Sequence, residues 1–171
     1  MKCFECGRAL RVKRPRVYPY RESGLSSVGL TGIRVYVCPS CKIEVPEIPN
    51  VVGLHQIIAS QLTRKPAPLT GPEFRFLRKE IGLKAKDLAP CLGTTDVNLS
   101  RWETGTTPIN PAADRLLRTL YSLKTMQAGR AVEPQKFIAA FLDDLKQIAP
   151  SKRPHPMGMR IPAHRLAPLP T

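Results

Sequence analysis

The stretch LKAKDLAPCLGTTDVNLSRWETG, residues 83–105, has the pattern of two short helices joined by a tight turn. An apolar stripe at helical spacing marks the first helix, and Gly93 is a C-terminal stop. The stripe consists of Leu83, Leu88, Ala89 and Leu92. Thr94 or Thr95 offers an N-cap hydroxyl to the second helix, which ends at Gly105. The pattern predicts a helix-turn-helix motif, with an ordinary helical hairpin as the alternative.

The second helix of this stretch has an inward and an outward face. Leu99 and Trp102 lie three residues apart and are predicted to face the core. Val97, Asn98 and Arg101 lie toward the opposite, solvent-facing side. A helix-turn-helix places such a face in the major groove of DNA. These side chains are therefore candidates for contacts with DNA.

Helical signals begin before this stretch, at residues 72–81. Thr70 and Glu73 form a capping-box pattern, and Pro72 falls in the first turn. The buried side of this helix is predicted to consist of Phe74, Leu77, Ile81 and Phe76. The helix is expected to belong to the same domain as the two that follow.

A fourth helix is predicted after Asn110, which caps it, with Pro111 at its first position. Its core face consists of Ala113, Leu116, Leu117 and Leu120. Four short helices predict a compact all-α domain at 70–125. Within it, Pro90 is expected to cost a helical hydrogen bond and to kink its helix, and Cys91 is expected to be buried.

Four of the five cysteines form two CxxC pairs, Cys3 with Cys6 and Cys38 with Cys41. In a cytoplasmic protein such pairs indicate metal binding rather than disulfides. Two knuckles of this kind present four thiolates as a tetrahedron around one Zn²⁺ ion per chain. Four thiolates leave no open position for a catalytic water, so the zinc is expected to be structural. A redox dithiol is the alternative, but the second matched pair argues against it.

The segment between the two cysteine pairs has the composition of short β-strands. Valine, isoleucine and tyrosine alternate with turn residues, and IRVYV at 33–37 runs directly into the second pair. Residues 1–49 are therefore predicted to form a small β-rich, zinc-ribbon-like N-terminal domain.

Residues 50–69 are predicted to form a short helix and a linker. Asn50 can cap the helix, whose apolar stripe consists of Val51, Leu54, Ile57, Ile58 and Leu62. The segment RKPAPLTG at 64–71 is a basic, proline-bearing linker. His55 has no second ligand nearby and the cysteine site is already full, so it is interpreted as structural.

The last part of the chain divides into two predicted segments. Residues 126–149 include an amphipathic helix at 134–148, which either docks on its own domain or forms a dimer or partner surface. Residues 150–171 contain six prolines and four basic side chains but no acidic ones. That composition predicts a disordered basic tail.

Charge and hydropathy restrict the class of partner. The 171 residues contain 27 Lys and Arg against 13 Asp and Glu, a net charge of +14, which favours a polyanionic partner. No apolar run approaches the roughly 20 residues that a membrane span needs, and the N-terminus has no apolar signal core, so a cytoplasmic location without membrane contact is expected. The sequence has no phosphate-binding glycine loop, no His/Glu metal triad and no nucleophile with a paired base. It is therefore not expected to be an enzyme.

The chain resembles MqsA/YgiT-type antitoxins and regulators in three features taken together. These are the two cysteine pairs, the segment VGLTGIRVYVCPSC that leads into the second pair, and the Cro/Xre-like helix-turn-helix that follows. The resemblance covers roughly residues 1–125. It implies a structural zinc held by Cys3, Cys6, Cys38 and Cys41 in a unit that contacts a ribonuclease-type toxin. It also implies a helical domain that dimerises and binds operator DNA.

The resemblance also implies the residues that contact DNA. By similarity to Cro/Xre domains, the positions that face DNA on the helix at 95–104 are Thr95, Asp96, Val97 and Arg101. Arg101 is the expected anchor, since a guanidinium pairs bidentately with guanine. The family's asparagine in this helix aligns with Val97, so a role for Asn98 in reading adenine is left open.

Four further residues near this surface are assigned roles. Lys84 and Lys86 are expected to position the DNA backbone. Arg78 and Glu103 sit where Cro/Xre domains often hold an internal ion pair.

The leading hypothesis is a sequence-specific, homodimeric repressor of transcription that binds double-stranded DNA. A second layer of this hypothesis makes it the autoregulatory antitoxin of a toxin–antitoxin pair. A zinc-ribbon RNA-binding accessory protein without sequence-specific duplex readout is the alternative. Few aromatic side chains are available for base stacking, which argues against that alternative.

Overall fold

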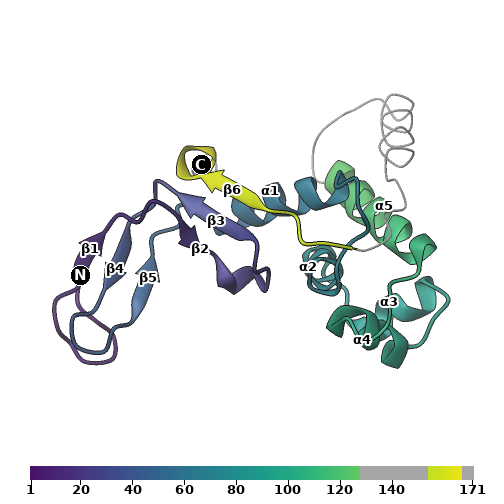
Figure 1. Cartoon of the computed structure of the whole chain (residues 1–171), viewed down its shortest axis with the longest axis horizontal. Helices are drawn as coiled ribbons and strands as arrows, with labels where there is room; N and C mark the ends of the chain where they lie inside the picture. The colour runs from purple at the N-terminus through teal and green to yellow at the C-terminus, as the bar shows by residue number, and fades with distance from the viewer. Residues whose placement is uncertain (128–153, 167–171) are drawn as a thin grey trace. The chain divides into compact units, whose positions relative to one another are not determined.

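The computed structural model describes residues 1–127 and 154–166 (Figure 1). The chain divides into two compact units. The first unit contains Met1–Glu22, Ser26–Leu54 and the C-terminal segment from Gly158. The second contains Ser23–Leu25 and His55–Met157. The first is rich in strands and the second is helical, which confirms the predicted order of a β-rich unit and a helical unit.

One sheet of the first unit contains β1 (Arg11–Lys13), β4 (Val35–Val37) and β5 (Glu44–Pro46), in the order β1-β4-β5. Both pairings are antiparallel. β4 lies at the centre because it pairs with β1 on one side and with β5 on the other, and it leads directly to Cys38. One of its faces is buried, since Val35 and Val37 are buried while Tyr36 between them is partly exposed.

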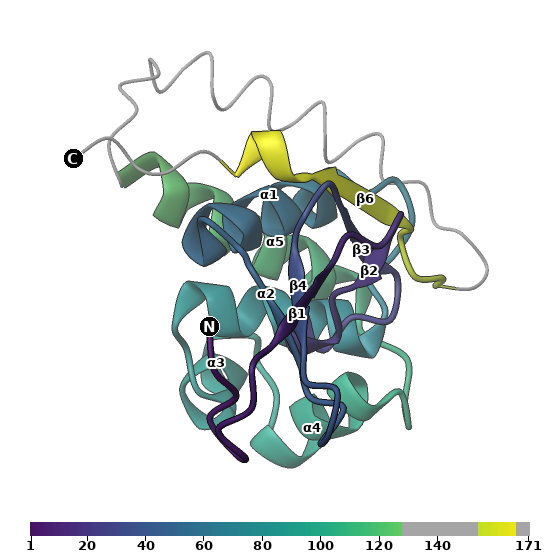
Figure 2. The same ribbon diagram turned by 90° about the vertical axis from the view of Figure 1, so that its left-hand side faces the viewer.

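The second sheet of this unit contains β2 (Tyr18–Pro19), β3 (Val28–Thr31) and β6 (Met159–Pro162). β2 runs antiparallel to β3, whereas β6 runs parallel to it. Figures 1 and 2 show β6, at the yellow end of the colour scale, beside β3. A short 3-10 helix, Arg21–Ser23, follows β2, and another, Ala163–Arg165, follows β6.

The prediction of a disordered tail at 150–171 is wrong for the strand and the short helix that follows it. Met159, Ile161 and Leu166 are buried in the first unit, at 4%, 1% and 1% exposure. The burial of these three apolar side chains stabilises the segment, although its proline-rich composition is typical of disorder. Residues 150–153 and 167–171 lie outside the described part of the chain. So does the whole of the helix predicted at 134–148. Of the predicted segment 126–149 only the first two residues are described, and they end the preceding helix.

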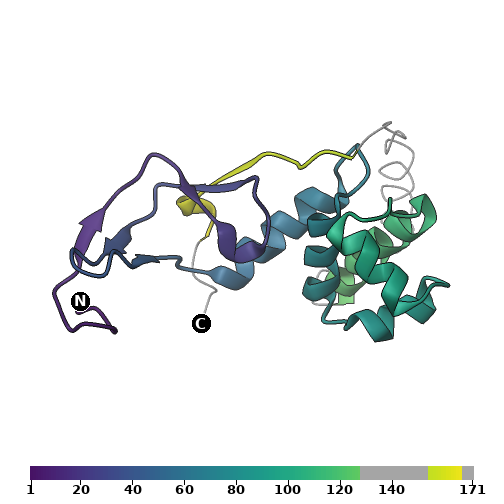
Figure 3. The same ribbon diagram turned by 60° about the horizontal axis from the view of Figure 1, so that its bottom comes forward.

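The helices are α1 (Val51–Thr63), α2 (Gly71–Ile81), α3 (Ala85–Cys91), α4 (Asp96–Thr104) and α5 (Pro111–Gln127). The boundary between the units falls within α1. In the helical unit α2 contacts both α4 and α5, and α3 contacts α4 (Figure 3). Its fully buried apolar side chains include Phe74, Leu77, Leu88, Leu99 and Leu117. The helices predicted around residues 50–62, 72–81, 83–93, 95–104 and from 111 are therefore confirmed.

The helix ends follow the predicted capping residues. Asn110 Oδ1 accepts a hydrogen bond from Ala112 N at 2.8 Å, and Glu73 Oε2 accepts one from Thr70 N at 2.7 Å. Gly82 and Gly105 close α2 and α4 in the left-handed conformation, with φ of 86° and 76°. Local sequence thus determines where these helices start and stop.

Three expectations about α3 and α5 are modified by the structure. Leu116 is 39% exposed and Cys91 is exposed, so neither is the core residue predicted. Pro90 lies one residue before the end of α3. Because proline has no N–H, it cannot donate to the carbonyl of Lys86, four residues earlier, and Lys86 is exposed. The cost of the proline is small there because the helix ends at Cys91.

The linker between α1 and α2 is held by buried charges. Arg118 on α5 pairs with Asp114, with Nε 2.7 Å from Oδ1, and its Nη atoms donate to the carbonyls of Lys65 at 2.6 Å and Ala67 at 2.8 Å. Asp114 Oδ2 accepts from Leu69 N at 3.1 Å. The segment called a basic linker is therefore an integral part of the helical unit.

In the part of the chain that the structure describes, no helix combines the length and the apolar character needed to cross a membrane.

Candidate metal centre and exposed helical surface

The two cysteine pairs form knuckles with the same backbone geometry. In the first, Cys3 N donates to Arg8 O at 2.8 Å and Gly7 N donates to Cys3 O at 2.9 Å. In the second, Cys38 N donates to Ile43 O at 2.9 Å and Lys42 N donates to Cys38 O at 3.1 Å. The residue after each pair has a positive φ, 70° at Gly7 and 63° at Lys42. Two segments far apart in sequence thus present their thiols in the same way.

The knuckles bring all four sulfur atoms together. The Sγ atoms of Cys3, Cys6, Cys38 and Cys41 lie within 4.8 Å of one another. Cys3 and Cys41 are 3.8 Å apart, and Cys38 is 3.5 Å from both Cys6 and Cys41. A disulfide would need about 2.05 Å, whereas the edge of a tetrahedron with metal–sulfur bonds of about 2.3 Å is about 3.8 Å. The cluster therefore fits one tetrahedrally coordinated metal ion.

The pKa values of two of the thiols are shifted in opposite directions. Backbone amides near the second knuckle, that of Cys41 first, lower the pKa of Cys38 to about 6. The pKa of Cys41 rises to about 12, chiefly because its thiol donates to Cys6 and Cys38. Several thiolates at this spacing repel one another in the absence of a positive charge. A metal ion at the centre would remove that repulsion, with the four sulfurs as its tetrahedral ligands.

In the helical unit, α3 and α4 are joined by a short turn at residues 92–95. Thr95 is the N-cap of α4, and its side chain accepts from Asn98 N at 3.2 Å. Leu99 and Trp102 are buried, and the Trp102 ring meets Phe74 edge-on with 6.1 Å between centroids. The inward face predicted for this helix is confirmed.

The outward face of α4 carries most of the predicted contact residues. Thr95, Asp96 and Arg101 are exposed, and Val97 is 58% exposed. Arg101 has no side-chain hydrogen bond or ion pair with any described residue. Lys84 and Lys86, at the start of α3, are exposed as well.

Asn98 differs from its neighbours because its side chain is already engaged. Its Nδ2 donates to Thr94 Oγ1 at 2.8 Å, and the residue is partly buried. Ser100 is exposed on α4 and was missed, although its spacing of four from Asp96 places it on the same face. The exposed surface of α4 therefore includes Asp96, Val97, Ser100 and Arg101, with Thr104 at its end.

The ion pair expected behind this surface is present. Arg78 Nε lies 2.5 Å from Glu103 Oε1 and its Nη2 lies 2.9 Å from Oε2, while Nη1 donates to Leu83 O at 2.8 Å. The pair joins α2 to α4, and through Leu83 it also reaches the turn that precedes α3. Glu103 is thereby committed to holding these helices together.

Comparison of the chain with protein families, with curated proteins and with solved structures found no match.

Proposed function

We propose that the protein is a sequence-specific DNA-binding regulator of transcription, in which α3 and α4 form a helix-turn-helix and α4 enters the major groove. The observation that carries the proposal is the outward face of α4, where Arg101 has no partner among the described residues and Val97 lies exposed beside it. An arginine and an aliphatic side chain on one helical face suit guanine and the thymine methyl group respectively. The net charge of +14 favours attraction to phosphates.

The roles of the neighbouring residues follow from their contacts. Lys84 and Lys86 at the start of α3 provide backbone phosphate contacts. Thr95 caps α4 and orients its first turn. Asn98 contributes to this turn through Thr94 rather than reading a base.

The test is selection of bound duplexes from a random library, followed by affinity measurements on the selected site. Arg101→Ala should weaken binding by about 1–3 kcal/mol and relax the preference at one base position. Arg115→Ala, on the exposed side of α5, is the matched control and should bind like the parent. Equal loss in both variants, or equal affinity for single-stranded RNA and duplex DNA, would count against specific duplex readout and favour the RNA-binding alternative.

The phosphate contacts have a distinct signature. Lys84→Ala and Lys86→Ala should weaken binding to all duplexes alike, and each should reduce the slope of log affinity against log salt by about 1. An effect confined to one sequence would contradict the assignment.

We assign the metal as Zn²⁺ with a structural role, because four cysteine thiolates are the donor set typical of closed zinc sites. The ion would be held by Cys3, Cys6, Cys38 and Cys41 and would fix the ends of the β1-β4-β5 sheet. A homodimer is proposed because two recognition helices about 34 Å apart can occupy successive major grooves. Sedimentation of the full chain with and without duplex tests this.

An antitoxin role is a second layer of the proposal, supported by the resemblance of the cysteine pairs and helix-turn-helix to MqsA/YgiT-type proteins. It requires a small ribonuclease as the binding partner. Titrating the full chain into a ribonuclease encoded beside its gene should abolish RNA cleavage at about equal molar amounts. Unchanged cleavage, with no complex on gel filtration, would remove this layer and leave the DNA-binding proposal intact.

A further inference from the structure

β6 is attached to the first unit as an extended peptide would be. It adds a parallel strand to β3, with Met159, Arg160, Ile161 and Pro162 opposite Val28, Gly29, Leu30 and Thr31. Met159 N donates to Ser27 O at 2.9 Å at the start of this pairing. Main-chain hydrogen bonds from a sheet edge, with side-chain pegs at alternate positions, are how proteins bind added strands.

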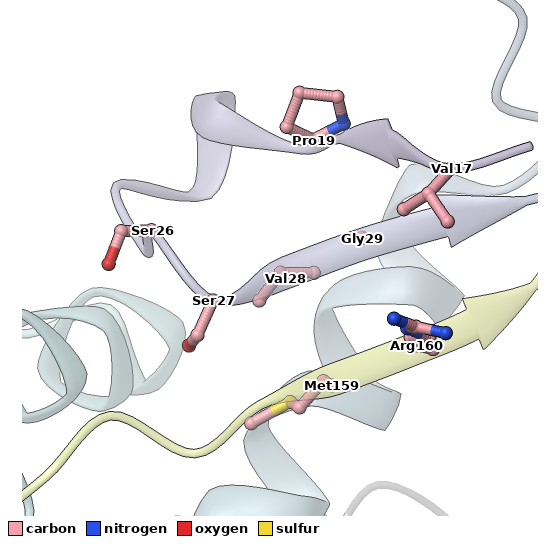
Figure 4. Close-up of a pocket in the computed structure, with 8 residues that line it drawn as sticks. All are labelled: Val17, Pro19, Ser26, Ser27, Val28, Gly29, Met159 and Arg160. Atoms are coloured by element: carbon pink, nitrogen blue, oxygen red, sulfur yellow. The ribbon is translucent and has the colours of Figure 1, made fainter. Parts of the chain in front are cut away.

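The side chains of this strand alternate between buried and exposed, as such binding requires. Met159 and Ile161 are buried, and Arg160 between them is exposed. Figure 4 shows the two strands side by side, with Arg160 near Gly29 and a shallow hollow extending toward Val17. At Gly29 an added Cβ would meet Val17 Cγ1, just before β2, at 2.6 Å, whereas the nearest atom of β6, Met159 O, would be 3.9 Å away. The fit of β6 to the edge of β3 therefore depends on the main-chain pairing and on the two buried side chains.

Opening the attachment leaves the pairing of the other strands intact, but it also breaks two contacts of the residues just before β6. Lys65 Nζ donates to the carbonyl of His155, and Met157 N donates to Glu73 Oε1 at 2.8 Å. A second copy offers the same partners to an exchanged segment. β6 is the outer strand in the order β2-β3-β6, and it follows every other strand in the chain. The burial of three apolar side chains is offset by the entropy lost in ordering the residues that carry them. An edge strand with so few buried side chains stays paired in part because its own chain keeps it close to β3.

The tether is long enough to reach another molecule. The chain from Gln127 to Pro154 spans up to about 90 Å when fully extended, at 3.3–3.6 Å per residue. A second copy of this chain carries the identical strand, which fits the β3 edge in the same register.

We propose that β6 is an exchangeable strand, and that two copies of the chain pair by placing each β6 on the β3 edge of the other. A tether keeps its segment at an effective concentration on the order of 1 mM. Exchange is therefore rare in dilute solution and competes with the closed monomer near that concentration. The inference goes beyond the proposed function and does not depend on DNA binding.

The experiment uses the opposed residues Thr31 and Pro162 in the full chain with Cys91→Ser and the metal bound. One chain carries Thr31→Cys and the other carries Pro162→Cys, so a disulfide between them requires strand exchange. The two tagged chains are mixed at about 10 µM or about 1 mM, equilibrated, diluted and oxidised at once. A single chain with both substitutions is the positive control, because opposed residues of neighbouring strands lie within disulfide reach.

The covalent heterodimer should be about 1% of the product at the lower concentration and comparable to monomer at the higher one. Adding Ile161→Asp to the Pro162→Cys chain should abolish it, because a buried peg is lost. If the double variant closes its own disulfide but no heterodimer forms at about 1 mM, the proposal is overturned. A heterodimer that survives Ile161→Asp, or a double variant that fails to close, overturns it as well.

Discussion

At the scale of single residues, Gly71 shows how closely the helices approach. A Cβ at this position would lie 2.6 Å from the carbonyl oxygen of Glu103 and closer still to that of Trp102. Both are backbone atoms at the end of α4, so they cannot rotate away. The start of α2 and the end of α4 are therefore in contact only because residue 71 has no side chain.

Gly71→Ala should reduce the free energy of unfolding by about 1–3 kcal/mol, the usual cost of overpacking. Urea denaturation followed by Trp102 fluorescence measures it. Gly158→Ala is the control, because no atom lies within 4 Å of the added Cβ. Equal stability of the two variants would show that α2 and α4 pack less closely than described.

Tyr121 on α5 predicts a stability change at alkaline pH. Burial, and secondarily the charge of Glu80, raises its pKa to about 12 from 10.0. The folded state therefore resists the ionisation that the unfolded chain undergoes above pH 10, and stability falls as pH rises from about 10 toward 12. Tyr121→Phe should flatten this part of the stability profile, measured by urea denaturation at several pH values. A profile as steep as the parent's would exclude Tyr121 as a cause.

At the scale of elements, the pair of Arg118 and Asp114 fixes the approach of the linker to α5. Arg118 is fully buried and Asp114 is 4% exposed. Arg118→Met removes the cation and leaves the carboxylate buried, with the carbonyls of Lys65 and Ala67 losing their donor. The loss of stability should be about 3–5 kcal/mol.

The measurement is urea denaturation followed by circular dichroism. Arg115→Met on the same helix is the control and should stay within about 0.5 kcal/mol of the parent, since Arg115 is exposed. Adding Asp114→Leu to Arg118→Met should recover part of the loss, because no unpaired charge remains. No recovery would mean that the carbonyl contacts, rather than the ion pair, dominate.

The elements that could be predicted from sequence are those defined by local signals. Glu73, Asn110 and Pro111 fix helix starts through contacts within a few residues, and two CxxC pairs imply the sulfur cluster without any knowledge of the fold. Lys65 could not be predicted as buried, because its burial depends on Glu73, 2.7 Å from its ammonium, and on the carbonyl of His155. β6 was missed for the same reason, since the strand that it joins lies far away in sequence.

At the scale of the whole molecule, the metal centre should decide whether the first unit folds. Its sheets are short, so the proposed zinc ion contributes much of the free energy that closes the two knuckles. About one ion per chain is expected by elemental analysis. Chelation should abolish the dispersed chemical shifts of residues 1–45 while most of the helical circular dichroism persists.

Restoring zinc should reverse the change, whereas Cys3→Ser should not bind the ion tightly. Cys91→Ser is the control, because Cys91 lies in the helical unit outside the cluster. Full structure of residues 1–45 in the chelated protein would show that the sheets are stable without the metal.

The pairing of β3 with β6 also has a consequence for biosynthesis. About 130 residues separate Val28 from its partner Met159. At a translation rate of roughly 5–20 residues per second, β3 waits about 7–26 s for that partner to be synthesised. The cysteine knuckles and the β1-β4-β5 sheet are complete long before then, and they lie within the first 46 residues. The four cysteines can therefore come together early on the nascent chain, whereas the second sheet keeps an open edge until translation has almost ended.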